Sequence, residues 1–285
     1  MKITLLNQYY TFHLLEFGCV KEYTLEEKWA EASQLMMHRN LGEDDMMSWA
    51  AYFAKSAVTP LYKPSLTGVF PLLDEKAASF PVMQHCMQVI KDTVEKLNPG
   101  QIPVVAGDQP LYALMKMISW QNPNFSEDRF VIMLGGLHSE MVFWTNLGKL
   151  LDQSGWTDAL VEANVITSGR AQGVLHCSHV TRTRRMHTIF LAVLTKLMGI
   201  AFVNAESTLP YSEWKEKRCQ ESPTFLYWNL IRHIEILILM FVRSHRERNF
   251  NLYVNSMEHL VVFLFALDAT NYRSIPYSCC LWDIQ

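Results

Sequence analysis

Two short apolar runs, each ending in small or polar residues, constrain the fold most strongly. Residues 102–106 are followed by Gly107-Asp108, and residues 130–134 are followed by two glycines. Their length and β-branched content favour buried strands. Apolar residues recur at helical spacing from 110 to 120 and again from 138 to 151. Strand, helix, strand, helix is the βαβ pattern of a sheet that is covered by helices.

The rest of the chain has helical patterns. Thr24-Leu-Glu-Glu27 has capping-box spacing, and Ser222-Pro223 supplies the N-cap and first residue of a helix. We expect helices at about 24–37, 74–97, 223–247 and 252–267, and an extended connector at 63–73.

The predicted fold class is α/β and helix-rich, with a small, mostly buried sheet and additional helices. We divide the chain into an N-terminal helical segment, 1–62, and an α/β core with a helical C-terminal part, 63–285.

Composition limits the functions that the chain can have. An apolar content of 49% with 19% charged residues is typical of a globular protein. The formal net charge of −3 provides no global attraction to nucleic acid, so such binding requires a local basic patch. Six scattered cysteines are typical of reduced intracellular thiols. The most apolar run, 234–242, is shorter than the roughly 20 residues that span a bilayer. We expect an intracellular protein, nuclear or cytoplasmic, outside the membrane.

Three residues are candidates for chemistry at the ends of predicted elements. Asp108 has two interpretations: a helix N-cap, which the spacing favours, or a metal-binding carboxylate at the carboxyl end of a strand. His138 follows two glycines near a helix start, and a structural histidine is an equal alternative. Asp268 ends an apolar helical run, on the unfavourable side of the helix dipole, which indicates function or strain.

Basic and metal-binding patterns cluster between 176 and 187. His176, Cys177 and His179 have no second cluster of ligands, so we expect no zinc. Three arginines that alternate with threonines have the donors that contact phosphates, and a solvated helix start or internal ion pairs are the alternatives; they are Arg182, Arg184 and Arg185. A second basic cluster at 243–248 is explained by its place at a helix C-terminus.

Several motifs, in order along the chain, carry a resemblance that covers about residues 46–276. They are Lys63 to Pro71, Gly107-Asp-Gln-Pro-Leu-Tyr112, Phe130 to His138, Ser178-His-Val-Thr-Arg-Thr-Arg-Arg185, Gln220-Glu-Ser-Pro223 and Ala266-Leu-Asp-Ala-Thr-Asn-Tyr272. The sequence resembles a large, uncharacterised family of multicopy animal open reading frames that are taken to be transposon-derived. The layout of the acids is similar to that of ribonuclease-H-like transposases, by fold-level analogy.

The resemblance implies a site for phosphodiester chemistry. Asp108 and Asp268 would bind two Mg²⁺ or Mn²⁺ ions, His138 would orient a water or the scissile phosphate, and the arginines at 182, 184 and 185 would hold backbone phosphates. Family members continue beyond the Asn271-Tyr272 region into a segment that supplies a third acid. The tail of this chain, 277–285, does not resemble that segment, so we expect an incomplete fold and site from a truncated product.

Two functional hypotheses follow. The first is a transposon-derived, metal-dependent enzyme that cleaves or transfers phosphodiester strands, with DNA as its partner. The second is a non-catalytic module, domesticated or decayed, that binds nucleic acid or a protein. An unrelated α/β protein with chance similarity is a third alternative.

Overall fold

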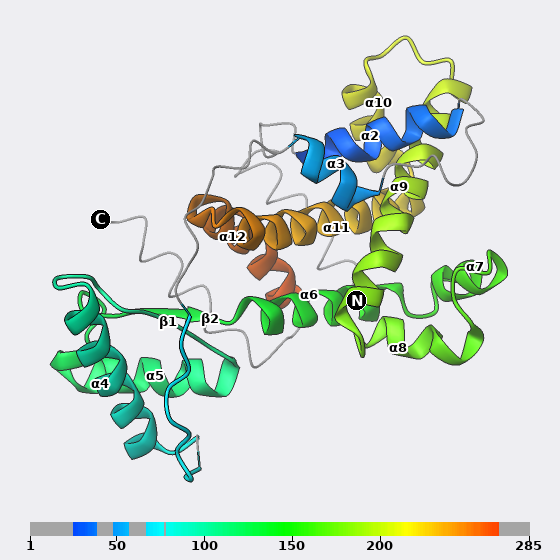
Figure 1. Cartoon of the computed structure of the whole chain (residues 1–285). Coiled ribbons are helices and arrows are strands. Elements are labelled where there is room, and N and C mark those ends of the chain that lie inside the picture. Colours follow the sequence, from blue (N-terminus) through cyan, green and yellow to red (C-terminus); the bar gives the residue numbers. More distant parts are fainter. Residues whose placement is uncertain (1–24, 39–47, 57–66, 77, 268–285) are drawn as a thin grey trace. The chain divides into compact units, whose positions relative to one another are not determined.

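The computed structural model describes residues 25–38, 48–56, 67–76 and 78–267 (Figure 1). Thr24, Asp268 and the tail from 277 lie outside these described residues. The chain forms two compact units, a smaller one of residues 60–139 and a larger one of residues 1–59 with 140–285.

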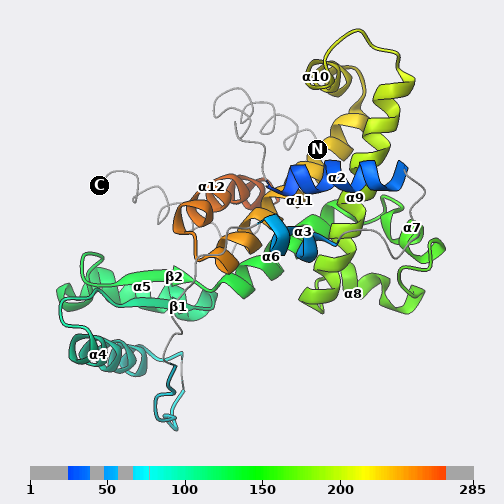
Figure 2. The ribbon, with the colours of Figure 1, turned by 45° about the horizontal axis from the view of Figure 1, so that its top comes forward.

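The smaller unit contains the predicted βαβ pattern. Strand β1 (Val104–Gly107) pairs with β2 (Val131–Leu134) in parallel, with Val104 opposite Val131 and Gly107 opposite Leu134. Helix α5 (Gln109–Gln121) connects them and packs on both strands. Helix α4 (Phe80–Leu97) packs on α5 (Figures 1 and 2), and a short 3₁₀ helix, η2 (Pro123–Phe125), follows α5. The parallel strand pair and its crossover helix are confirmed.

Burial in this sheet is one-sided. Ile132 and Leu134 of β2 are buried, whereas Val104 of β1 is 61% exposed. A Cβ at Gly107 would meet Met115 and Leu111 of α5, so Gly107 faces that helix. Side chains alternate along a strand, and Val104 therefore faces away from α5. The prediction of a mostly buried sheet holds for the face that α5 covers, where Ile132 and Leu134 lie, but not for the opposite face, where Val104 is exposed.

The larger unit consists of helices in its described part. The long helix α11 (Pro223–Glu247) has a buried centre, and α12 (Phe250–Ala266) packs along it. Ser222 caps α11 by accepting a hydrogen bond from the Phe225 N–H (3.3 Å), as the Ser-Pro pair predicts. The other elements are α2 (Leu25–His38), α3 (Trp49–Ser56), α6 (Gly136–Leu151), α7 (Trp156–Glu162), η3 (Ser168–Arg170), α8 (Ala171–Leu175), α9 (Val180–Asn204) and α10 (Tyr211–Glu221).

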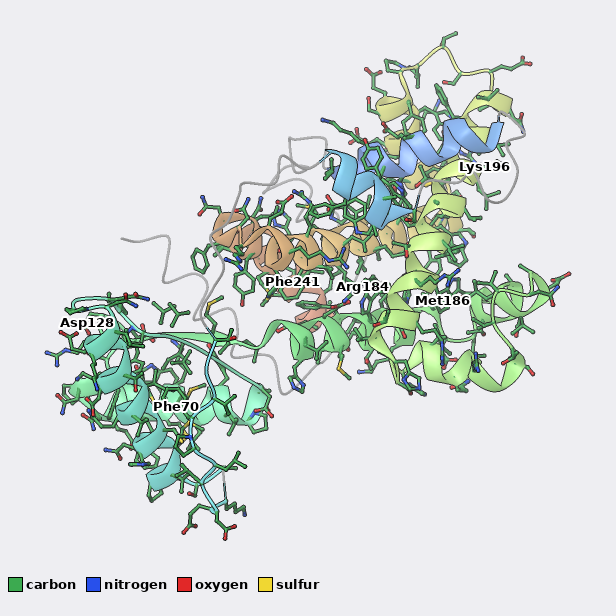
Figure 3. The ribbon with its side chains drawn as sticks, in the orientation of Figure 1. Phe70, Asp128, Arg184, Met186, Lys196 and Phe241 are labelled. Carbon is green, nitrogen blue, oxygen red and sulfur yellow. The ribbon has the colours of Figure 1, made fainter. Side chains whose placement is uncertain are left out.

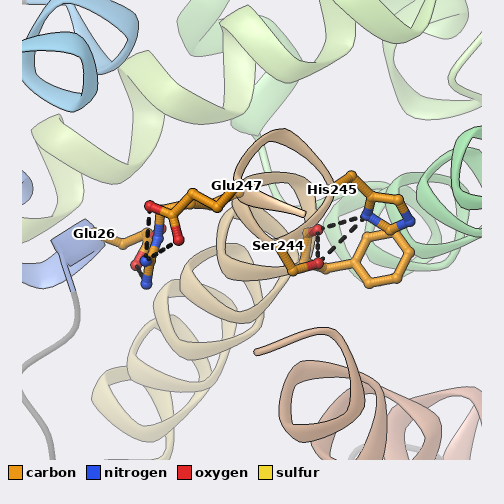
Figure 4. Close-up of polar contacts among 6 residues, drawn as sticks. Glu26, Ser244, His245 and Glu247 are labelled. Atoms are coloured by element: carbon orange, nitrogen blue, oxygen red, sulfur yellow. Dashed lines mark hydrogen bonds and ion pairs between the residues drawn. The ribbon is translucent and has the colours of Figure 1, made fainter. Parts of the chain in front are cut away.

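The N-terminal helix α2 packs against α9 and α11. Glu26 is completely buried and binds the Arg243 guanidinium through Nε at 2.7 Å. Figure 4 shows Glu26 and Glu247 meeting at this guanidinium. Ion pairing and packing thus join α2 to helices far along the chain. The predicted division at residue 62 lies outside the described residues and stays a prediction.

Helices α9 and α11 are long and apolar enough to cross a membrane, by length and composition. In the structure, 72% of the most apolar stretch of α11 and 44% of that of α9 are buried. The core helix of a soluble protein has the same properties, so these two helices do not establish a membrane segment.

Candidate anion-binding site

The first candidate position lies at the carboxyl ends of the two strands. Asp108 is the N-cap of α5, and its Oδ1 accepts a hydrogen bond from the Leu111 N–H at 3.1 Å. The Gly135 N–H donates to the Gly107 carbonyl at 2.6 Å, and a Cβ at Gly135 would lie 3.0 Å from that oxygen. Gly135 therefore permits the close approach of the two strand ends. His138 is exposed in the first turn of α6.

The predicted metal ligands are not brought together within the described part of the chain. Asp108 and His138 follow neighbouring strands, but Asp268 lies outside the described residues. The residues that the structure describes contain no group of three or more His, Cys, Asp or Glu side chains that could hold a metal ion. The geometry around Asp108 is that of the helix cap, and one carboxylate oxygen serves the cap.

The basic segment at the start of α9 forms a more elaborate arrangement. Arg184 binds Glu140 of α6 with two parallel hydrogen bonds, Nε to Oε1 at 2.7 Å and Nη2 to Oε2 at 2.6 Å. The indole N–H of Trp144 donates to the same Oε1 at 2.9 Å. The Glu140 side chain is 6% exposed and that of Arg184 is 22% exposed. Arg184, labelled in Figure 3, thus connects α9 to α6. This buried carboxylate fixes the plane of the guanidinium.

The other two predicted arginines lie on a different face of α9. Arg182 and Arg185 are three residues apart, so they share one face of the helix, while Arg184 points inward to Glu140. Arg185 is exposed and Arg182 is partly buried. Among the described residues, no carboxylate lies within ion-pair distance of Arg182 or Arg185. Their positive charges are thus available to an external anion.

The second basic cluster of the sequence contributes Arg246, from the end of α11. Burial and the charge of Arg184 lower the pKa of Arg246, and Glu140 acts in the opposite direction. The side chain of Arg246 is thus within electrostatic reach of both Arg184 and Glu140. Arg243, from the same cluster, is instead engaged by Glu26 and Glu247. The sequence contains no local signal for the influence of Arg184 on the pKa of Arg246, because the two residues come from different helices.

A buried polar pair connects α9 and α11. His187 Nδ1 lies 2.8 Å from Glu235 Oε1, and both side chains are fully buried. The imidazole stacks between the rings of Trp144 (4.5 Å between centroids) and Trp156 (4.7 Å). In the sequence, the indication of this pair is Glu235, the single acid within the apolar run 234–242.

The three residues His176, Cys177 and His179 lie partly at the surface and partly in the interior. His176 and His179 are exposed, while Cys177 is buried. Burial raises the pKa of the Cys177 thiol, and Thr183 acts to lower it. A raised pKa makes the thiolate scarce, so this cysteine is suited to packing and not to nucleophilic chemistry.

The fold is that of a helix-rich protein with a small parallel sheet, and a basic segment begins helix α9. A family model described as a domain of unknown function (DUF8702) matches residues 48–220, and the chain belongs to that family. The matched region includes both strands, Glu140 and the arginines of α9. No curated protein and no solved structure matches the chain.

Proposed function

We propose that this protein is a non-catalytic module that binds the phosphate backbone of a nucleic acid through Arg182, Arg184, Arg185 and Arg246. The observation that carries the proposal is the guanidinium of Arg184, which Glu140 holds in a fixed plane at the start of the basic segment of α9. Side chains that are held in place before binding lose less conformational freedom when a ligand arrives.

The hydrogen-bonding capacity of the cluster supports this function. A guanidinium has five N–H donors, and Glu140 occupies two of those of Arg184. The remaining donors, with those of Arg246 and the exposed Arg185, match the oxygens of phosphodiesters. Because the whole chain has a net charge of −3, such binding requires local positive charge, and Arg182 and Arg185 supply it on one face of α9.

The enzymatic hypothesis is a second candidate, with one observation in its favour. Asp108 follows the carboxyl end of β1, beside the end of β2, and open α/β sheets bind ligands at such strand ends. In this proposal the sheet is ribonuclease-H-like, the protein is transposon-derived, and Asp108 and Asp268 hold Mg²⁺ or Mn²⁺. We rank it below binding because Asp108 is already used as a helix cap.

Salt dependence of binding tests the proposed function. We would measure the affinity for duplex DNA over a range of salt for the wild type and for the variant R182A/R185A/R246A. The negative slope of log K against log salt should fall in magnitude by about 0.9 for each phosphate contact that is lost. The matched control is K215A/K217A/R218A, which removes the same charge from α10. Equal slopes for wild type and triple variant, or equal losses in variant and control, would contradict the proposal.

A further inference from the structure

His187 and Glu235 join the two long helices of the larger unit. His187 belongs to α9 and Glu235 to α11, and their contact of 2.8 Å is closed to solvent on both sides. Trp144 and Trp156 stack on the two faces of the imidazole with interplanar angles of 15° and 24°. The ring cannot rotate without displacing one of these tryptophans, so the hydrogen bond holds a fixed geometry.

The charged group that acts on Glu235 is Arg232 of α11, which itself interacts with acids of α2. Arg232 lies one turn earlier in α11 and acts to stabilise the charged form of Glu235. The Arg232 guanidinium also donates to Thr195 of α9 at 3.2 Å, and it lies 3.8 Å from Glu27 of α2. Glu31 of α2 interacts with Arg232 as well. The charge of Arg232 is therefore shared among several partners.

The charged neighbours on the side of His187 are already paired or exposed. Glu140 of α6 accepts hydrogen bonds from Trp144 and Arg184. Arg184 lies one turn before His187 in α9. Helix α7 brings Trp156 against the imidazole, while its Asp158 is exposed. The buried pair must therefore balance most of its charge internally.

We propose that His187 and Glu235 together hold one proton in the folded protein and form a clamp between α9 and α11 that is most stable at mildly acidic pH. With two protons, the pair would bury an imidazolium beside a neutral acid. With none, it would bury a carboxylate beside a neutral ring. With one proton the pair is neutral overall, which avoids the cost of an uncompensated buried charge. Burial lowers the pKa of His187 to about 3 and raises that of Glu235, in agreement with one retained proton.

The pH dependence follows from counting protons in the unfolded chain. Between about pH 4.3 and about pH 6.5 the unfolded His and Glu also hold one proton together. In that range the pair therefore adds no pH dependence to the free energy of unfolding. Above about 6.5 the unfolded chain releases that proton and the folded pair keeps it, so stability falls as pH rises. Below about 4.3 the unfolded chain gains a second proton, and stability falls as pH decreases.

The clamp also regulates the basic surface, a consequence that rests on the proposed function. Arg184 lies one turn before His187, and Arg246 lies about three turns after Glu235. Weakening of the clamp at alkaline pH would let the two helices that carry these arginines separate. The existence of the clamp does not depend on what the arginines bind.

Chemical denaturation of the full chain at a series of pH values tests the clamp. We would compare the wild type with E235Q, which keeps the shape of a protonated Glu but cannot titrate. From about pH 5 to about pH 8, the folding equilibrium constant of the wild type relative to E235Q should fall about tenfold per pH unit. The ratio isolates the proton of Glu235, which the folded wild type keeps and the unfolded chain has already released in this range. The control is E221Q, at a carboxylate that is 45% exposed, for which the ratio should stay flat. A flat ratio for E235Q would mean that the folded pair holds no proton, and would overturn the proposal.

A second measurement needs no variant. Nuclear magnetic resonance of the Glu235 carboxyl carbon and the His187 ring nitrogens in the wild type should find one proton on the pair at about pH 7. An ionised carboxylate beside a neutral imidazole would overturn the clamp even if E235Q does not fold. Failure of duplex DNA binding together with the expected pH signature would contradict the proposed function and leave the clamp intact.

Discussion

At the scale of single residues, Asp108 separates the two functional hypotheses. Its carboxylate caps α5 through the Leu111 N–H. Asn caps helices about as well as Asp, whereas Ala does not. We expect D108N to keep the wild-type free energy of unfolding and D108A to lose about 1 kcal/mol, as measured by urea denaturation. Equal losses in both variants would show that the charge of Asp108, and not its capping oxygen, stabilises the protein.

The same residue tests the metal hypothesis. A cation that binds only the folded state at 100 times its dissociation constant stabilises it by about 2.7 kcal/mol. If the protein is a non-catalytic binding module, added Mn²⁺ should change the melting temperatures of the wild type and D108N equally. A shift in the wild type that D108N abolishes would establish Asp108 as a metal ligand, because D108N preserves the cap.

At the scale of elements, Gly148 sets the approach of α6 to α8. A Cβ at Gly148 would lie 2.0 Å from the backbone carbonyl oxygen of Leu175, a separation that requires one helix to move. Ala is otherwise favoured over Gly inside a helix by about 1 kcal/mol. We expect G148A to destabilise the protein by about 1–3 kcal/mol in denaturant titrations. Helix propensity alone would predict the opposite sign.

Gly173 of α8 provides the matched control for this contact. A Cβ there would meet Ser178 at 3.8 Å, which is ordinary van der Waals contact. G173A should therefore be neutral or slightly stabilising. If G148A and G173A had the same effect, the close approach of the α6 and α8 backbones would be refuted.

At the scale of the whole molecule, the ion pair between Glu26 and Arg243 joins residues that are 217 positions apart. Burial raises the pKa of Glu26, although Arg243 acts to lower it. R243M would leave Glu26 buried without its principal partner, and breaking a buried pair in this way costs about 3–5 kcal/mol. E26Q should cost less, because Arg243 keeps Glu247 at 3.1 Å.

The loss in R243M should depend on pH. Protonation of Glu26 removes the uncompensated charge, so the difference in unfolding free energy between wild type and R243M should shrink as pH falls toward 5. Denaturation at about pH 7 and about pH 5 measures this difference. A loss that does not change with pH would mean that Arg243 stabilises the unit through packing.

The sequence by itself determined the local elements and their ends. The β-branched runs and the helix between them predicted the parallel pair of β1 and β2, and Ser222-Pro223 predicted the start of α11 at Pro223. The capping interpretation of Asp108 also came from its neighbours. These predictions succeed because strand pairing across a short crossover, helical periodicity and end caps depend on residues that are close in the chain.

Only the tertiary structure decided which charged and polar groups meet. Arg184 reaches Glu140 across 44 positions, and His187 reaches Glu235 across 48. From the sequence alone, Glu140 is explained by a favourable interaction with a helix dipole. Glu235 is only an acid that interrupts an apolar run. The physical reason is that a buried charge must find a partner wherever packing places one, and the packing of helices is set by shape across the whole unit.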